Sequence, residues 1–526
     1  MKLRTTPWPV LSVVAGLAAA TLTGCGSEQG GSGGKGIVVG MSDDVQATDP
    51  ASGYDPGSWL LFNNVFQSLL SFPIAGVEPE PEAAKQCGFT DTKTKVFSCT
   101  LRDGLTFSNG DPLTSADVKF SFDRMMKIND DAGPAIMFPM LDKVETPDAK
   151  TVVFKLNVPD ATFPSKIASG AGSIVNRRDY PAGKLRTDGK AVGSGPYKLD
   201  SFDKNRAVFS VNPDYKGTAH VKNSGVTLRF FHGDQSALKK ALLGKDVDVA
   251  YRGLAAKDIA DIERDTSTSQ GIDIVEGTSA EVQHLVFNMK DPVVGKLGVR
   301  KAMAYLIDRE AVVQEVYDST AQPLYSIIPA GISGHNTAFF DLYGARPQRA
   351  KAEAALRAEG ITEKVELTLW STPSRYGPST DQEFETMAKQ LNASGLFDAK
   401  VKSVDFSQYE RDVHNGKYGV YVKGWVPDYP DPDNFTAPFF GEGNVLGNNY
   451  ENRTITHDII PATAAESDRG ATGEDYDRLQ RLVARDIPII PLWQAKQYAV
   501  VGDSVYGLEN CLDASTVFRF WEISKG

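Results

Sequence analysis

Strand-like and helix-like patterns alternate along this sequence, and no internal repeat is detectable. Runs rich in β-branched and aliphatic residues occupy 365–370 and 401–406, and helical apolar spacing fills 380–393 between them. Strands that alternate with helices form sheets whose faces the helices cover, so the pattern predicts an α/β fold. Because a single hydrophobic core rarely serves more than about 300 residues, a chain of 526 residues is expected to form two or three lobes.

The same two patterns cover most of the remaining chain. Residues 75–190 are expected to form a β-rich unit punctuated by prolines, and Ser115 is expected to cap a helix within it. The further expected strands are 37–41, 96–101, 151–156, 207–211, 226–231, 247–251, 281–288, 489–493 and 498–501. The further expected helices are 59–71, 115–126, 235–243 and 298–307.

The charge balance narrows the range of partners. The sequence holds 56 Lys and Arg residues against 67 Asp and Glu residues, which gives a formal net charge of -11. Proteins that bind nucleic acids or anionic membrane surfaces display basic patches or blocks, and no long basic block occurs here. We therefore expect no nucleic-acid partner.

The first residues resemble a bacterial lipoprotein signal. A basic start precedes an apolar stretch over 11–21, which is too short to remain as a membrane span, and the sequence LTGC follows at 22–25. The resemblance implies that residues 1–24 are removed and that Cys25 carries the lipid. Residues 25–36 are rich in Gly and Ser and are expected to form a flexible tether. The protein is thus expected at the outer face of the cell membrane, held by its lipid anchor.

Three further cysteines lie in the exported part. Cys87 and Cys99 flank a predicted hairpin, QCGFTDTKTKVFSC, so a cross-strand disulfide is expected in an oxidising compartment. Two buried free thiols fit the same spacing, because spacing alone does not fix connectivity. Cys511 has no evident partner and is expected to be a buried free thiol.

Seven short motifs, in order, resemble the solute-binding lipoproteins of ABC importers, specifically family 5, which binds peptides and nickel. The resemblance implies a two-lobed α/β clamp with an additional β-rich domain, the cluster C type of binding protein. It also implies a ligand enclosed between the lobes and delivered to ABC permease subunits. The motifs are TDPA at 48–51, NVF at 64–66 with LL at 69–70, LRDGLTF at 101–107, PLTSADV at 112–118, GSGPYKL at 193–199, VRKAMAYLIDRE at 299–310 and GWVPDYPDPDNF at 424–435.

The resemblance and the element pattern together predict a domain organisation. Two lobes are expected to close about a hinge near residues 280 and 488. Lobe I is expected to comprise 37–74, 191–280 and 488–526, the additional domain 75–190, and lobe II 281–487. We expect a monomer that has no cofactor and catalyses no reaction.

The segment GWVPDYPDPDNF is expected to be a stiff loop. Its prolines at 427, 430 and 432 each remove a backbone donor and fix φ, which excludes a helix interior or a central strand. Asp431 followed by Pro432 is typical of a helix start, and Asp433 suits the first turn. Asp428 lies before that start, between Pro427 and Tyr429.

The resemblance assigns a role to Asp428. An acid at the matching position of peptide-binding relatives receives the α-ammonium group of the ligand, and Trp425 is expected to form an apolar or cation-π wall. The segment LWSTPSRYGP at 369–378 resembles the one that presents an arginine to the ligand carboxylate, although the spacing is one residue shorter. Arg375 therefore fits both that role and a plain surface charge. The expected ligand-binding residues are Gly424, Trp425, Asp428, Tyr429 and Arg375.

Other functions fit the sequence less well. An anchored extracellular hydrolase would need a credible catalytic motif, and no HExxH pattern or nucleophile elbow lies outside the tether. A calcium loop starting at Asp431 would have Phe435 at the fifth position and Thr436 in place of glycine, so no metal site is expected. Within the family, a nickel chelate or an oligosaccharide remains an alternative to a short peptide, although the six histidines form no close pair.

Overall fold

The computed structural model describes residues 36–264, 271–377 and 379–526. These described residues form one compact unit. The expected signal peptide and Cys25 lie outside the described residues, so their processing stays a prediction. In the described ranges no helix is both long enough and apolar enough to cross a membrane.

A mixed sheet of 11 strands joins most of the unit. Its strand order is β15-β14-β16-β12-β17-β11-β1-β10-β9-β8, with β13 paired to β17. The strands are β1 (Ile37–Met41), β8 (Tyr197–Asp203), β9 (Arg206–Val211), β10 (Gly225–Phe230), β11 (Val249–Tyr251), β12 (Ile272–Phe287), β13 (Ala321–Pro323), β14 (Val365–Ser371), β15 (Phe397–Ser403), β16 (Val420–Trp425) and β17 (Ile489–Gly502).

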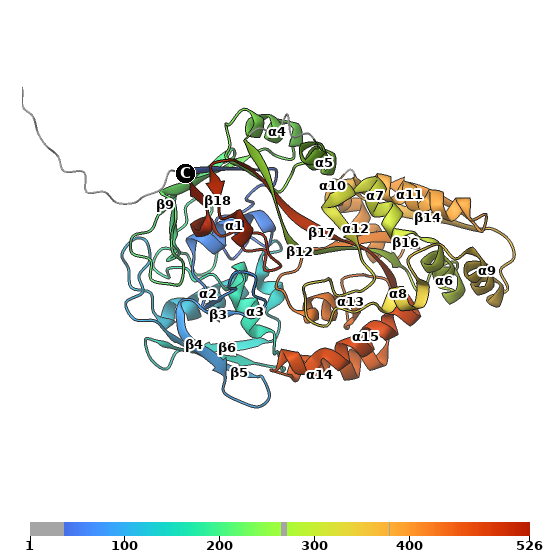
Figure 1. Cartoon of the computed structure of the whole chain (residues 1–526). Coiled ribbons are helices and arrows are strands. Elements are labelled where there is room, and N and C mark those ends of the chain that lie inside the picture. The colour runs from blue at the N-terminus through green and yellow to red at the C-terminus, as the bar shows by residue number, and fades with distance from the viewer. Residues whose placement is uncertain (1–35, 265–270, 378) are drawn as a thin grey trace, which may run out of the picture. The chain divides into compact units, whose positions relative to one another are not determined.

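The two long strands β12 and β17 connect the two ends of this sheet. They pair antiparallel from Ile272 opposite Gly502 to Val286 opposite Ile489, with an irregular register between Thr278 and Val282. Figure 1 shows them side by side between the helices α1–α3 and the helices α6, α7 and α11. The chain therefore passes from one lobe to the other within β12 and again within β17.

Smaller sheets complete the fold. The four-stranded sheet has the order β4-β5-β7-β6, and Cys87 in β4 forms a disulfide bond with Cys99 in β5 at an S–S distance of 2.03 Å. Cys511 is a buried free thiol. The strands of the small sheets are β2 (Leu70–Ser71), β3 (Glu80–Pro81), β4 (Ala84–Phe89), β5 (Val96–Leu101), β6 (Leu141–Glu145), β7 (Thr151–Leu156), β18 (Val505–Tyr506) and β19 (Ser524–Lys525).

In the part of the chain that the structure describes, fifteen α-helices lie around these sheets. They are α1 (Pro56–Val65), α2 (Ser115–Ile128), α3 (Phe163–Ala168), α4 (Gln235–Leu243), α5 (Ala256–Arg264), α6 (Leu297–Leu306), α7 (Arg309–Val316), α8 (Ala338–Tyr343), α9 (Arg349–Ala358), α10 (Pro373–Tyr376), α11 (Ser379–Ala393), α12 (Phe406–His414), α13 (Ala437–Phe440), α14 (Ile460–Ala465) and α15 (Gly473–Asp486).

Two large hydrophobic cores divide the unit. The first contains Met41, Phe62 and Phe520 together with Phe122 and Phe154 of the predicted additional domain. The 75–190 segment thus shares its core with the segments around it. The second core is built from residues between Ala280 and Ala514 and includes the end of β12 from Ala280 onward together with residues of β14 and β16. The α/β class predicted from the sequence is confirmed, and the proposed domain boundaries stay a prediction.

Several local expectations were wrong. The helix expected over 59–71 ends at Val65, because Leu70–Ser71 pairs with Glu80–Pro81 as a strand. Thr114, not Ser115, precedes the first turn of α2, and its backbone N–H donates to the Asp117 carboxylate at 2.9 Å.

Two errors concern strands. The strands expected over 489–493 and 498–501 are one strand, β17. The strand expected over 401–406 spans Phe397–Ser403 instead, and α12 begins at Phe406.

Candidate functional site

Two predicted ligand contacts follow neighbouring parallel strands. β14 and β16 pair in parallel, with Leu369 opposite Val420. Arg375 lies in the short helix α10 after β14, and Asp428 follows the end of β16. The carboxyl ends of parallel strands share one edge of a sheet, where open α/β sheets bind their ligands. The fold therefore brings both residues to the same edge, although they come from segments about 50 residues apart.

The Asp428 carboxylate is held by donors from two parts of the chain. Tyr54, which packs against the first core, donates its hydroxyl to Asp428 Oδ1 at 2.7 Å. Asn434 donates its amide to Asp428 Oδ2 at 3.2 Å. Burial raises the pKa of Asp428, whereas both donors and the charge of Lys166 lower it. Within the described ranges Asp428 has no ion-pair partner at salt-bridge distance, so its charge is desolvated but not neutralised.

Asn434 positions both Asp428 and Trp425. Its side-chain oxygen accepts from Trp425 Nε1 at 2.9 Å and from the Asp428 backbone N–H at 3.0 Å. The residue is 2% exposed and belongs to the 3-10 helix η4 (Pro432–Phe435). Its donor and acceptor are thus both used to fix the loop that follows β16.

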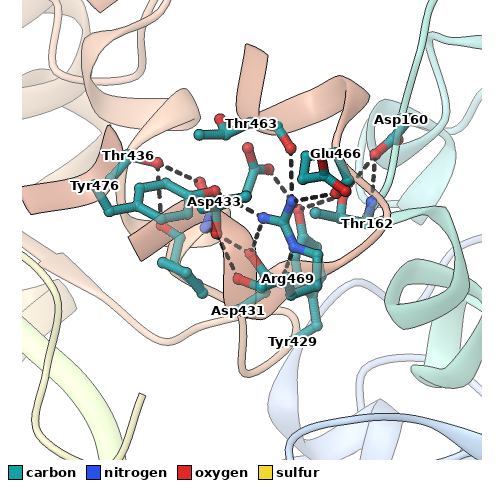
Figure 2. A network of polar contacts seen from close by, with 12 residues as sticks. Asp160, Thr162, Tyr429, Asp431, Asp433, Thr436, Thr463, Glu466, Arg469 and Tyr476 are labelled. Carbon is teal, nitrogen blue, oxygen red and sulfur yellow. Dashed lines mark hydrogen bonds and ion pairs between the residues drawn. The ribbon is translucent and has the colours of Figure 1, made fainter. Parts of the chain in front are cut away.

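The start of η4 is as predicted from the sequence. Asp431 is the N-cap, accepts from the Asp433 backbone N–H, and is followed by Pro432 at the first helical position. Asp431 also forms a double hydrogen bond with Arg469 through Nε at 2.9 Å and Nη2 at 2.8 Å, as Figure 2 shows. Burial raises the pKa of neighbouring Asp433 to about 6. Asp431 and Asp433 therefore anchor the loop that follows β16 on its buried side.

Tyr429 belongs to this anchoring network. It is 4% exposed, its hydroxyl donates to Asp433 Oδ2 at 3.2 Å, and Figure 2 places it beside Asp431 and Arg469. Its hydroxyl and ring therefore stabilise the loop from inside the protein.

Gly424 makes room for an aromatic ring. A Cβ atom at this position would lie 2.9 Å from Cε1 of Tyr376, which is closer than carbon atoms pack. The missing side chain therefore allows the end of α10 to pack on β16. Gly424 and Tyr376 together join the two segments that carry Asp428 and Arg375.

Arg375 itself is exposed. Its guanidinium lies 5.5 Å from the ring centroid of Phe406, and within the described ranges it forms no ion pair at salt-bridge distance. A ligand group at this edge would meet an arginine whose hydrogen-bond donors are available.

A cavity of about 320 Å³ lies where strands of both cores meet. Asp43 and Arg252 follow β1 and β11, which are parallel neighbours, and their side chains form an ion pair at 2.8 Å. Glu281 of β12 and Trp493 of β17 line another side of the same cavity. Because the next residue, Val282, pairs with Trp425, Glu281 lies at the edge where β16 ends.

Electrostatic influence connects this cavity with the predicted contacts. Burial raises the pKa of Glu281, and the charges of Arg252 and Arg375 oppose that rise. Burial also raises the pKa of Asp55, next to Tyr54, and the charge of Asp43 adds to it. Charges influence one another in this way only over short distances. Arg375 therefore lies within electrostatic range of Glu281, and Asp428 is connected to the cavity through Tyr54 and the neighbouring Asp55, although neither Arg375 nor Asp428 lines it.

A buried carboxyl group fixes the aromatic wall of the cavity. Glu383 is fully buried and accepts hydrogen bonds from Tyr317 at 2.9 Å, from Trp493 Nε1 at 3.1 Å and from Gln283. Burial raises the pKa of Glu383 to about 8, so it is mostly neutral at pH 7 despite these donors. The rings of Tyr317 and Trp493 lie 4.7 Å apart between their centroids and both line the cavity.

Several of these residues were not found from the sequence. Tyr54, Glu281 and Glu383 are separated from Asp428 by tens to hundreds of positions, and their contacts arise only from tertiary packing. Asn434 lay within the quoted loop, and its position three residues after the N-cap Asp431 was the available signal. No group of three or more His, Cys, Asp or Glu side chains within the described ranges is arranged to hold a metal ion.

Residues 78–447 match the model for the middle region of bacterial extracellular solute-binding proteins, family 5. A probable D,D-dipeptide-binding periplasmic protein of Escherichia coli is 26% identical over 93% of this chain and 94% of its own length. A dipeptide-binding protein of Pseudomonas aeruginosa is 25% identical over 87% of this chain and 88% of its own length.

A solved structure confirms the predicted two-lobed architecture. An ABC transporter-associated periplasmic binding protein from Helicobacter pylori, in complex with a peptide, superposes with a TM-score of 0.77 at 20% identity. The match covers 94% of this chain and 99% of that one. Since the family model spans most of the chain, the chain belongs to the bacterial extracellular solute-binding proteins of family 5.

Proposed function

We propose that this protein is the substrate-binding component of an ABC importer and that it captures short peptides between its two lobes. The observation that carries the proposal is the Asp428 carboxylate, which is held by Tyr54 and Asn434 at the ligand-binding edge of the sheet. Relatives named as dipeptide-binding proteins along nearly the full length of the chain support the choice of a peptide.

The chemistry of Asp428 fits a peptide N-terminus. A half-buried carboxylate without an ion-pair partner is costly, and a ligand ammonium group would neutralise it. Trp425, whose indole is fixed by Asn434, would form an apolar wall beside that ammonium. The guanidinium of Arg375 would receive the peptide carboxylate. A ligand with a blocked or anionic N-terminus would leave Asp428 without a partner and would bind weakly.

The wider organisation follows the sequence-based predictions. Lobe I would comprise 37–74, 191–280 and 488–526, the additional domain 75–190, and lobe II 281–487. Closure would bend β12 and β17 near the irregular register at Thr278–Val282. Lipid on Cys25 would hold this monomeric, non-catalytic protein outside the cell membrane, beside the ABC permease subunits.

The replacement Asp428→Asn tests the proposal. It removes the counter-charge of the ammonium group and retains the size of the side chain, so peptide binding is expected to weaken by at least about 2 kcal/mol. Isothermal calorimetry with a peptide bound by the wild-type protein measures the change. Asp405→Asn is the matched control, because Asp405 is exposed and precedes α12 on the surface. Equal affinity of Asp428→Asn and the wild type would remove Asp428 from the site.

A further inference from the structure

We propose that the cavity beside Glu281 is a subsite for a positively charged side chain of the ligand, such as lysine. The inference rests on the proposed peptide-binding function and assigns a preference to a part of the cleft beyond the contacts with the two peptide termini. Glu281, Tyr317 and Trp493 are the residues that would define the subsite.

The charges around the cavity leave one carboxylate without a partner. Arg252 Nε contacts Asp43 Oδ2 at 2.8 Å, and Lys496 contacts Glu276 Oε1 at 2.9 Å, so these charges neutralise each other in pairs. Within the described ranges Glu281 forms no side-chain hydrogen bond and no ion pair at salt-bridge distance. Of the four charged side chains that line the cavity, Asp43, Arg252, Glu281 and Lys496, only Glu281 is thus without an ion-pair partner among the described residues.

Arg375 does not neutralise this charge by contact. Its positive charge lowers the pKa of Glu281, but burial has the larger influence and raises it. The guanidinium of Arg375 instead lies over the ring of Phe406 at 5.5 Å. A ligand cation that enters the cavity would thus be the contact partner of Glu281.

Aromatic rings make the same cavity suitable for a cation on an aliphatic stem. Tyr317, Trp493 and Tyr498 line it, and ring faces attract ammonium and guanidinium groups. Glu383 holds Tyr317 and Trp493 through their hydroxyl and indole N–H groups, and Ser319 O accepts from the Tyr498 hydroxyl at 2.6 Å. The rings are fixed by these bonds and act as preformed walls around the Glu281 carboxylate.

The cavity is less suited to an anion. The two cations that line it, Arg252 and Lys496, are already paired with Asp43 and Glu276. An acidic side chain would also approach Glu281 and Asp43 and meet like charge from both. The expected order of preference is therefore a cationic side chain, then a neutral one of the same length, then an acidic one.

The experiment compares tetraalanine peptides in which one position carries lysine, norleucine or glutamate. Norleucine has the same aliphatic stem as lysine but no charge, so the affinity ratio of each pair isolates the ammonium group. At one position or more the wild-type protein is expected to bind the lysine peptide at least about tenfold tighter than the norleucine peptide. In Glu281→Gln that ratio is expected to fall to about one, while affinity for the norleucine peptide stays within about twofold.

Glu366→Gln serves as the control, because Glu366 is an exposed residue of β14, and it is expected to retain the wild-type ratio. Equal binding of lysine and norleucine peptides by the wild type at every position overturns the inference and leaves peptide binding intact. A lysine preference that persists in Glu281→Gln overturns it as well. If none of the peptides binds, the proposed function itself fails. If a variant does not fold, the comparison of lysine and norleucine peptides with the wild-type protein still tests the inference.

Discussion

Asn434 shows how a single amide organises the cleft. It accepts from Trp425 Nε1 and from the Asp428 backbone, and it donates to the Asp428 carboxylate. The residue acts through Asp428 and Trp425 and is therefore a positioning residue.

The replacement Asn434→Ala is expected to reduce both stability and peptide affinity. It leaves the half-buried donors of Trp425 and Asp428 without acceptors, which costs roughly 1–3 kcal/mol of unfolding free energy, and it releases the Asp428 side chain. Asn448→Ala is the matched control, because Asn448 is also buried and holds the backbone of Tyr450. We expect the control to lose stability but retain its affinity in calorimetry. Unchanged affinity in Asn434→Ala would show that Asp428 needs no such support.

At the scale of single residues, the sequence predicts the role of a residue where a local rule such as helix capping applies. The N-cap role of Asp431 followed from the Asp-Pro pair and is confirmed. The contacts of Tyr54 and Arg469 with the loop could not be predicted from the sequence, since they depend on tertiary packing. The ligand-contacting roles of Gly424, Trp425, Asp428, Tyr429 and Arg375 stay predictions.

The elements around the cleft meet at the buried Glu383. Its carboxyl group connects α11 with β12 through Gln283 and with β17 through Trp493. Burial raises its pKa from an ordinary value of 4.5 to about 8, so the folded protein retains a proton that the unfolded chain releases. The stabilisation from this group is complete below pH 4.5 and declines as the pH rises towards 8.

The pH dependence of unfolding tests this assignment. Between pH 5.5 and 8.5 the wild-type protein is expected to lose unfolding free energy on the order of 2 kcal/mol more than Glu383→Gln, whose amide does not titrate. Urea unfolding at both pH values measures the difference, and the exposed Glu366→Gln should follow the wild type. Parallel pH profiles of the wild type and Glu383→Gln would contradict the neutral carboxyl group.

The β4–β5 hairpin carries a second element-scale prediction. Its disulfide closes a loop with a sequence separation of 12, and such a constraint stabilises a protein by about 2–4 kcal/mol. Replacing Cys87 and Cys99 together with serine is expected to lower the melting temperature, and dithiothreitol should then have no further effect. Mass spectrometry of non-reduced digests identifies the bond in the wild type. Separate peptides for the two cysteines would rule it out.

Elements were predictable where the apolar pattern is uninterrupted. The helix over 235–243 coincides with α4, and the strand over 365–370 falls within β14. β17 was divided in two because Gln494 and Gln497 interrupt its apolar run. These amides donate to the backbone carbonyls of Ser279 and Thr278 in the irregular part of β12. The two glutamines therefore interrupt the apolar run of β17 because their side chains hydrogen-bond the neighbouring strand β12.

The whole molecule has the organisation of a clamp. The sheet edge with Asp428 and Arg375 is built on the second core, whereas Tyr54, Asp43 and Arg252 follow elements of the first. A ligand in the cleft would contact residues from both cores and so favour their closure. The two-lobed fold followed from seven motifs along the chain, whereas the shape of the cavity depends on side chains that meet only after folding.

Thermal melting of the purified protein with peptide pools tests the central claim most directly. Di- to pentapeptides, the same pools with acetylated N-termini, cello-oligosaccharides and Ni²⁺ are compared. A ligand at about 100 times its dissociation constant stabilises by roughly 2.7 kcal/mol, which raises the melting temperature measurably. Free peptides are expected to raise it and acetylated peptides are not, because only a free ammonium group can pair with Asp428. A rise with oligosaccharides or Ni²⁺ alone, or an equal rise with acetylated peptides, would contradict the account.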